Sequence, residues 1–166
     1  MLYKYDILVN YIILFLMSKN QENINNTETY KSTKPKEFIY KFKVTEDLLD
    51  EYNHINNARY LDLYEEARWA ILEGTFYGRQ YVKERAIGPV ILEVTVKFKR
   101  EIKLGEVITI ITKNKIEGNR IYIFSQEMKN ENGEICSTAI FKGALFDLKA
   151  RKIIKADEKW IKALGQ

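Results

Sequence analysis

The single histidine of this chain, His54, lies four residues after Asp50 in a polar, turn-forming segment, residues 50–57. A helical pattern without Pro or Gly follows directly and runs to Glu73. A helix N-terminus presents unpaired backbone N–H groups and a partial positive charge, which can hold an oxygen on which negative charge develops. A carboxylate beside such a site is suited to acyl transfer or hydrolysis. The alternative is that Asp50 serves only as a turn or cap residue.

The helix that must position these groups has one apolar face. Its apolar residues recur at spacings of three and four: Tyr60, Leu63, Tyr64, Ala67, Ala70 and Ile71. This period predicts an amphipathic helix whose opposite face carries Arg59, Asp62, Glu66 and Glu73. Asn56 is a good cap residue, so we expect the helix to begin near it and to stop at Gly74.

Asp50, the run NHINNARYL at 53–61 and the segment YEEAR at 64–68 resemble the hot-dog-fold acyl-CoA thioesterases. The resemblance is to the branch that includes hydroxybenzoyl-CoA thioesterase and the bacterial long-chain acyl-CoA thioesterases, and it covers roughly residues 37–148. Two positions depart from the usual pattern. Leu48 stands where many members have a second acid, and Asn53 stands where many have Gly.

The resemblance implies thioester hydrolysis, with Asp50 at the position of the catalytic carboxylate, acting either as general base or as nucleophile. The backbone N–H of Asn57 matches the group that polarises the thioester carbonyl. For His54 we expect orientation of the loop or of a water, with direct proton transfer as the alternative. Asn56 is expected to clamp the loop, with substrate contact as the alternative.

The substrate implied is an acyl-CoA, without cofactor or metal. Lys97, Lys99 and Arg100 are candidates for binding the CoA phosphates, unless they form only a solvated strand face. Tyr60, Tyr64 and Trp69 are candidates for lining an acyl pocket, with ordinary core packing as the alternative. Another hot-dog branch places its carboxylate on this helix, but here we expect Glu65 and Glu73 to be surface or interface residues.

The pattern after the helix predicts strands and short turns, so the fold class is α+β. A first strand near 38–44 is followed by the long helix, a connecting stretch at 76–86 and strands opening at Gly88-Pro89, 107, 121 and 135. In the strand after Pro89 alternation places these residues on one face: Val90, Leu92, Val94, Val96 and Phe98. Gly143 suggests a β-bulge, and residues 157–164 a short helix.

The resemblance makes this architecture a hot-dog fold, in which a curved antiparallel five-stranded sheet wraps one long central helix. Hot-dog proteins associate as homodimers or homotetramers with active sites at the dimer interface. Two alternatives to an acyl-CoA thioesterase are a thioesterase directed at acyl-carrier protein and a non-catalytic acyl-CoA-binding module.

Composition indicates an ordinary globular protein of 166 residues with a net charge of +4. One cysteine, Cys136, excludes an intrachain disulfide, and with one histidine a zinc centre is not expected. No nucleic-acid-binding module is present. Residues 1–36 are expected to be a poorly ordered extension before a thioesterase domain at 37–166. The apolar stretch 7–17 is short for a membrane span, so we expect a cytoplasmic protein, with membrane tethering as the alternative.

Overall fold

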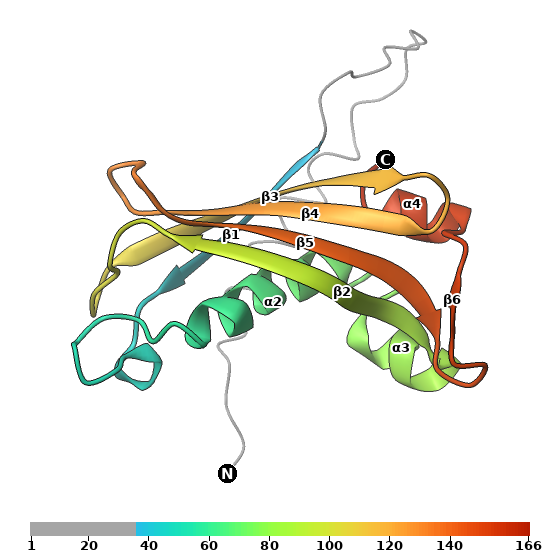
Figure 1. Ribbon diagram of the computed structural model, residues 1–166, viewed down its shortest axis with the longest axis horizontal. Coiled ribbons are helices and arrows are strands. Elements are labelled where there is room, and N and C mark those ends of the chain that lie inside the picture. Colours follow the sequence, from blue (N-terminus) through green and yellow to red (C-terminus); the bar gives the residue numbers. More distant parts are fainter. Residues whose placement is uncertain (1–35) are drawn as a thin grey trace, which may run out of the picture. The chain divides into compact units, whose positions relative to one another are not determined.

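A computed structural model of the protein describes residues 36–166, which contain an antiparallel sheet crossed on one face by a long helix (Figure 1). The expectations for residues 1–35 lie outside the described residues. The sheet has the order β1-β3-β4-β5-β2, and β6 pairs with the end of β5. Its strands are β1 Glu37–Lys43, β2 Ile87–Phe98, β3 Val107–Glu117, β4 Ile121–Lys129, β5 Ile135–Asp147 and β6 Lys152–Ile154. The predicted α+β class and the five long strands are confirmed, and β6 is an addition.

The long helix, α2, spans Arg59–Leu72 and buries one stripe of side chains against the sheet. The buried residues are Tyr60, Leu63, Tyr64, Ala67, Arg68 and Leu72. The prediction was wrong for Ala70, which is exposed, and it placed the start three residues early. Asn56 forms a separate turn instead: its side-chain Oδ1 accepts from Ala58 N at 2.9 Å and its carbonyl from Arg59 N at 2.9 Å.

Strand β2 contains a β-bulge that the alternation rule did not anticipate. Ile91 pairs with Gly143 and Glu93 with Lys142, which leaves Leu92 as the extra residue. Before the bulge Ile91 faces α2, and after it Val96 packs on the core and the Phe98 ring meets Tyr60. The core-facing side chains of β2 thus switch from odd-numbered to even-numbered positions at Leu92. The prediction that Val90 and Leu92 share a face with Val96 and Phe98 was therefore wrong.

Gly143, where a bulge was expected, instead lies opposite the extra residue. A Cβ on Gly143 would lie 2.4 Å from Cζ of Tyr122, whose ring covers the glycine. The position therefore requires a glycine because of close side-chain approach, and the β-bulge falls on the neighbouring strand.

Two short helices lie at one end of the sheet, where β2 and β4 begin (Figure 1). The stretch expected only as a connection contains α3, Arg79–Arg85. The predicted C-terminal helix is confirmed as α4, Glu158–Ala163, and Asp157 caps it by accepting from Trp160 N at 2.7 Å. Trp160 is buried against the rings of Tyr77 and Tyr122. Within 36–166 no helix has the length and apolar character needed to cross a membrane.

Candidate functional site

The Asp50 side chain sits in a tight turn that precedes α2. Its backbone N–H donates to His54 O at 3.0 Å, and its carbonyl accepts from Asn53 N at 3.0 Å. The carboxylate Oδ1 accepts from Tyr52 N at 3.0 Å, and the side chain is 11% exposed. Asn53 has a φ of 61°, a left-handed conformation that asparagine tolerates better than most residues. This explains how Asn53 can replace the glycine of the family pattern.

His54 lies beside the carboxylate of Asp50. Its Nδ1 is 3.5 Å from Asp50 Oδ1 and 3.4 Å from Ile55 O, and its ring stacks on that of Tyr52. The imidazole is 32% exposed, so solvent reaches it. These positions allow His54 to orient the carboxylate or a water near it.

The chain then enters the turn that opens α2. No hydrogen bond within residues 36–166 engages the backbone N–H of Asn57, which is exposed. Tyr60 follows in the first helical turn, where burial, with smaller contributions from Cys136, Glu106 and Asp50, raises the pKa of its phenol to about 12. Within residues 36–166, the turn before α2 therefore presents a backbone N–H without a partner seven residues after Asp50.

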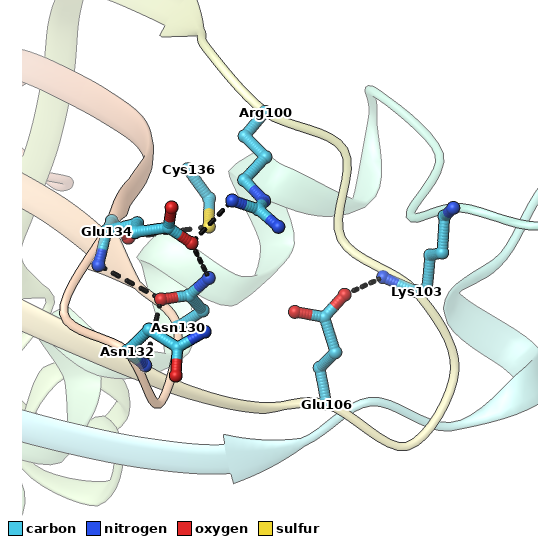
Figure 2. A network of polar contacts seen from close by, with 7 residues as sticks. All are labelled: Arg100, Lys103, Glu106, Asn130, Asn132, Glu134 and Cys136. Atoms are coloured by element: carbon cyan, nitrogen blue, oxygen red, sulfur yellow. Dashed lines mark hydrogen bonds and ion pairs between the residues drawn. The ribbon is translucent and has the colours of Figure 1, made fainter.

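A second loop, residues 99–106 between β2 and β3, holds the Asp50 segment in place. Ile55 N donates to Ile102 O at 2.9 Å, and both side chains are buried. The loop has its own supports, which Figure 2 shows: Lys103 N donates to Glu106 Oε1 at 2.7 Å, and Arg100 pairs with Glu134. The Asp50 segment is thus fixed by backbone bonds and buried isoleucines.

The predicted phosphate-binding residues gather where β2 ends. Lys97 and Lys99 are exposed there, and neither has an ion pair with another residue of the described part. Arg100 is exposed too, but its guanidinium pairs with Glu134 on the β4–β5 turn (Figure 2). The two lysines are free to meet an anion, whereas Arg100 already has a partner.

The two tyrosines proposed for the acyl pocket are buried in the core. Tyr64 is fully buried, its hydroxyl donates to Ser137 Oγ at 3.0 Å, and its ring contacts Phe141. Burial raises the pKa of this phenol above its ordinary value. The Tyr60 ring packs edge-on against Phe98 at 4.9 Å. Packing is the observed role of both tyrosines.

A cavity of about 210 Å³ opens between α2, β2 and β4. Its walls are mostly apolar and include Trp69, Leu72, Ile91 and Phe124, but Arg68 and Glu65 also line it. Arg68 is only 8% exposed, and burial lowers its pKa to about 10, so it stays charged at neutral pH. The sequence pattern predicted no functional role for Arg68, although its i+4 spacing from Tyr64 placed it on the buried stripe.

Comparison with known proteins agrees with this fold. Residues 44–164 match the model of the thioesterase-like superfamily. The chain is 30% identical over 119 residues to the long-chain acyl-CoA thioesterase FadM of Escherichia coli, covering 71% of this chain and 89% of that protein.

Solved structures give the same result. The probable thioesterase YbaW of Escherichia coli is similar at a TM-score of 0.66 and 29% identity, covering 76% of this chain and 96% of that one. A hypothetical Staphylococcus aureus protein solved in complex with CoA matches in fold at a TM-score of 0.73 and 16% identity, with coverage of 82% and 86%. The chain therefore belongs to the thioesterase-like superfamily, with the hot-dog fold.

Proposed function

We propose that this protein is an acyl-CoA thioesterase that uses Asp50 and the start of α2 to hydrolyse the thioester. Family membership and the similarity to FadM support the activity. The observation that carries the site is the turn in which the Asp50 carboxylate lies beside His54, just before a helix start where the Asn57 N–H has no partner among residues 36–166. A carboxylate can act as base or nucleophile, and an unpaired amide can stabilise the oxyanion, so together they can support thioester hydrolysis.

In the reaction the Asn57 N–H would bind the carbonyl oxygen and stabilise the negative charge that develops on it. Asp50 would act in one of two ways. As a base it takes a proton from water, whose oxygen attacks the carbonyl carbon; as a nucleophile it attacks that carbon itself and forms an anhydride that water then opens. In both routes the carbon–sulfur bond breaks and CoA leaves as the thiol.

Single-turnover hydrolysis in oxygen-18 water tests the nucleophilic route. If Asp50 is a base, or if water opens the anhydride at the acyl carbonyl, the label enters the released acid in the first turnover. If Asp50 is a nucleophile and water opens the anhydride at the Asp50 carbonyl, the label enters the Asp50 carboxylate. Mass spectrometry of the acid and of the peptide containing Asp50 reads both outcomes.

Lys97 and Lys99 would bind the phosphates of CoA, because both are exposed and free of ion pairs within the described residues. Arg100 is already paired with Glu134 through Nη1, which offsets its charge. Replacing both lysines with alanine should raise the KM for acyl-CoA without changing it for the matching N-acetylcysteamine thioester, which lacks phosphates. Equal changes for both substrates would reject a phosphate role.

The active form would be a homodimer or homotetramer built on the free edge of the sheet. Strand β2 is an edge strand of 12 residues. Its exposed apolar side chains are Ile91, Leu92, Val94 and Phe98. An apolar edge of this length invites pairing with a second strand, which would cover those side chains. Val94 belongs to a non-hydrogen-bonded pair with Phe141, so its N–H points away from β5. The variant Val94→Pro should then give a monomer in sedimentation analysis; an unchanged assembly would contradict pairing through β2.

The decisive experiment is a panel of acyl-CoAs of different length and aromaticity, with release of free thiol as the readout. Hydrolysis of at least one member by the assembled protein is expected. Hydrolysis only of acyl-carrier protein would redirect the activity to that partner, and tight binding without hydrolysis would make the protein a binding module. The proposal places the enzyme in cytoplasmic fatty acid metabolism, in line with the long-chain acyl-CoA specificity named for FadM.

A further inference from the structure

Arg68 is a buried charge without a counter-ion in contact. Its Nη1 donates to Gln126 Oε1 at 2.8 Å, and its guanidinium stacks over the ring of Phe141 at 3.8 Å. No carboxylate of residues 36–166 lies within ion-pair distance of it, and no hydrogen bond within that part uses Nε or Nη2. Nε and Nη2 are therefore the donors of Arg68 that a ligand could engage.

The cavity between α2, β2 and β4 offers the space for that partner. Arg68 lines the cavity, and its Nε and Nη2 are not sealed from solvent, so both can meet a ligand there. The other walls are largely apolar, with Trp69, Leu72 and Ile91 among them. A mostly apolar pocket that also presents a charged donor can bind an apolar ligand and fix one oxygen of it.

The cavity is also placed to receive the far part of a substrate. Arg68 lies nine residues beyond Arg59, where α2 begins, which is about 14 Å along the helix axis. An acyl chain whose carbonyl is held at the start of α2 and which follows the helix would bring its distal end to Arg68. The distance fits a chain of intermediate length rather than a short acyl group.

We infer that Arg68 selects acyl groups that carry an oxygen acceptor at their distal end, a hydroxyl or a carboxylate, over acyl groups that end in a methyl. The inference rests on the proposed thioesterase function. The guanidinium fork would donate to that oxygen through Nε and Nη2, the two groups without another partner in the described part of the chain. Glu65 also lines the cavity, but it is exposed and its carboxylate accepts a hydrogen bond from Trp69 Nε1 at 3.0 Å. It makes no hydrogen bond with Nε or Nη2 of Arg68.

The test uses 2-oxoalkyl-CoA ketones, which retain the carbonyl but cannot be hydrolysed. Ketones with octanoyl, dodecanoyl and hexadecanoyl lengths are made with methyl, hydroxyl or carboxylate ends, and their Kd for the assembled wild type is measured calorimetrically. At the best length a hydroxyl or carboxylate end should bind about 10- to 100-fold more tightly than the methyl end. Comparing the two oxygen ends shows which one the cavity takes.

Arg68→Met should abolish that preference while leaving the Kd of the methyl-ended ketone unchanged within about threefold. Arg68→Lys keeps the charge and should retain part of the preference for the oxygen-ended ketone. Arg120→Met, in the exposed β3–β4 turn, is the matched control and should change neither Kd. If Arg68→Met does not fold, the Kd values of oxygen-ended and methyl-ended ketones for the wild type still test the inference.

Tighter or equal binding of the methyl end at every length in the wild type would overturn the inference. A preference for the oxygen end that survives in Arg68→Met would also overturn it. Hydrolysis of the corresponding thioesters is assayed separately. A protein that shows the binding preference but hydrolyses no thioester would contradict the proposed function and leave the assignment of Arg68 standing.

Discussion

The two polar regions along α2 are organised in opposite ways. At the helix start, Asp50 and His54 are partly exposed, and their contacts are short-range bonds within one turn. In the middle of the helix, Arg68 and Gln126 are buried: Gln126 accepts from Arg68 and donates to Tyr64 O at 3.2 Å and Thr112 Oγ1 at 2.9 Å. Groups that must meet substrate and water stay near solvent, whereas groups that shape the interior are bonded across the sheet.

This contrast has a consequence for stability. Removing a polar group near solvent leaves little unpaired, because water takes the place of the lost partner. Removing one from the buried cluster leaves several donors and acceptors without partners. Substitutions at the helix start should therefore affect catalysis, and substitutions in the middle should affect the free energy of unfolding.

The largest effect is expected for Asp50→Asn. Loss of the base or nucleophile should reduce kcat by about 10²- to 10⁴-fold, while the thermal midpoint stays near that of wild type. Thiol release and thermal denaturation measure the two quantities. Asp47→Asn, three residues upstream and exposed in the 3-10 helix Glu46–Leu48, is the control and should keep full activity. A large loss of stability in Asp50→Asn would place Asp50 among the structural groups instead.

Gly143→Ala should destabilise the interior by about 1–3 kcal/mol through overpacking, since the new methyl group would meet the buried Tyr122 ring. Urea denaturation measures the change. Ile140→Ala, on the same strand with an exposed side chain, should shift the free energy of unfolding by no more than about 0.5 kcal/mol. Equal shifts in the two variants would mean that Tyr122 can move away from Gly143.

Gln126→Met should lower the free energy of unfolding by about 2 kcal/mol, because Arg68 Nη1 loses its acceptor and Thr112 Oγ1 and Tyr64 O lose their donor. The neighbouring Ser125→Ala, which is exposed, serves as the control in the same denaturation experiment. An unchanged free energy of unfolding in Gln126→Met would show that the buried cluster adds no net stability. The contrast with the exposed groups at the helix start would then fail.

The smallest effect separates two adjacent asparagines at the helix start. Asn56→Ala removes the acceptor for Ala58 N and should cost about 1 kcal/mol. Asn57→Ala should change neither stability nor turnover appreciably, because the proposed role of Asn57 belongs to its backbone N–H. A strong loss of activity in Asn57→Ala with normal folding would assign the role to the side chain.

The sequence was sufficient for the class and order of the long elements because their apolar periods are regular. It also pointed to the loop of Asp50, since short-range turn residues define that loop. It could not place Arg68 in the interior, because a buried arginine is stable there only through contacts with Gln126 and Phe141, which are distant in the sequence. The β-bulge at Leu92 likewise depends on pairing with Gly143, a long-range feature.

The central claim is that the Asp50 carboxylate and the Asn57 N–H meet at one carbonyl group. A crystal structure of the assembled protein with a bound 2-oxoalkyl-CoA ketone tests it directly. The account predicts the ketone oxygen within about 3.2 Å of Asn57 N, with an Asp50 carboxylate facing the ketone carbon either directly or through one water. A ketone oxygen bound elsewhere, with the Asp50 carboxylates of the assembly turned away from its carbon, would contradict it.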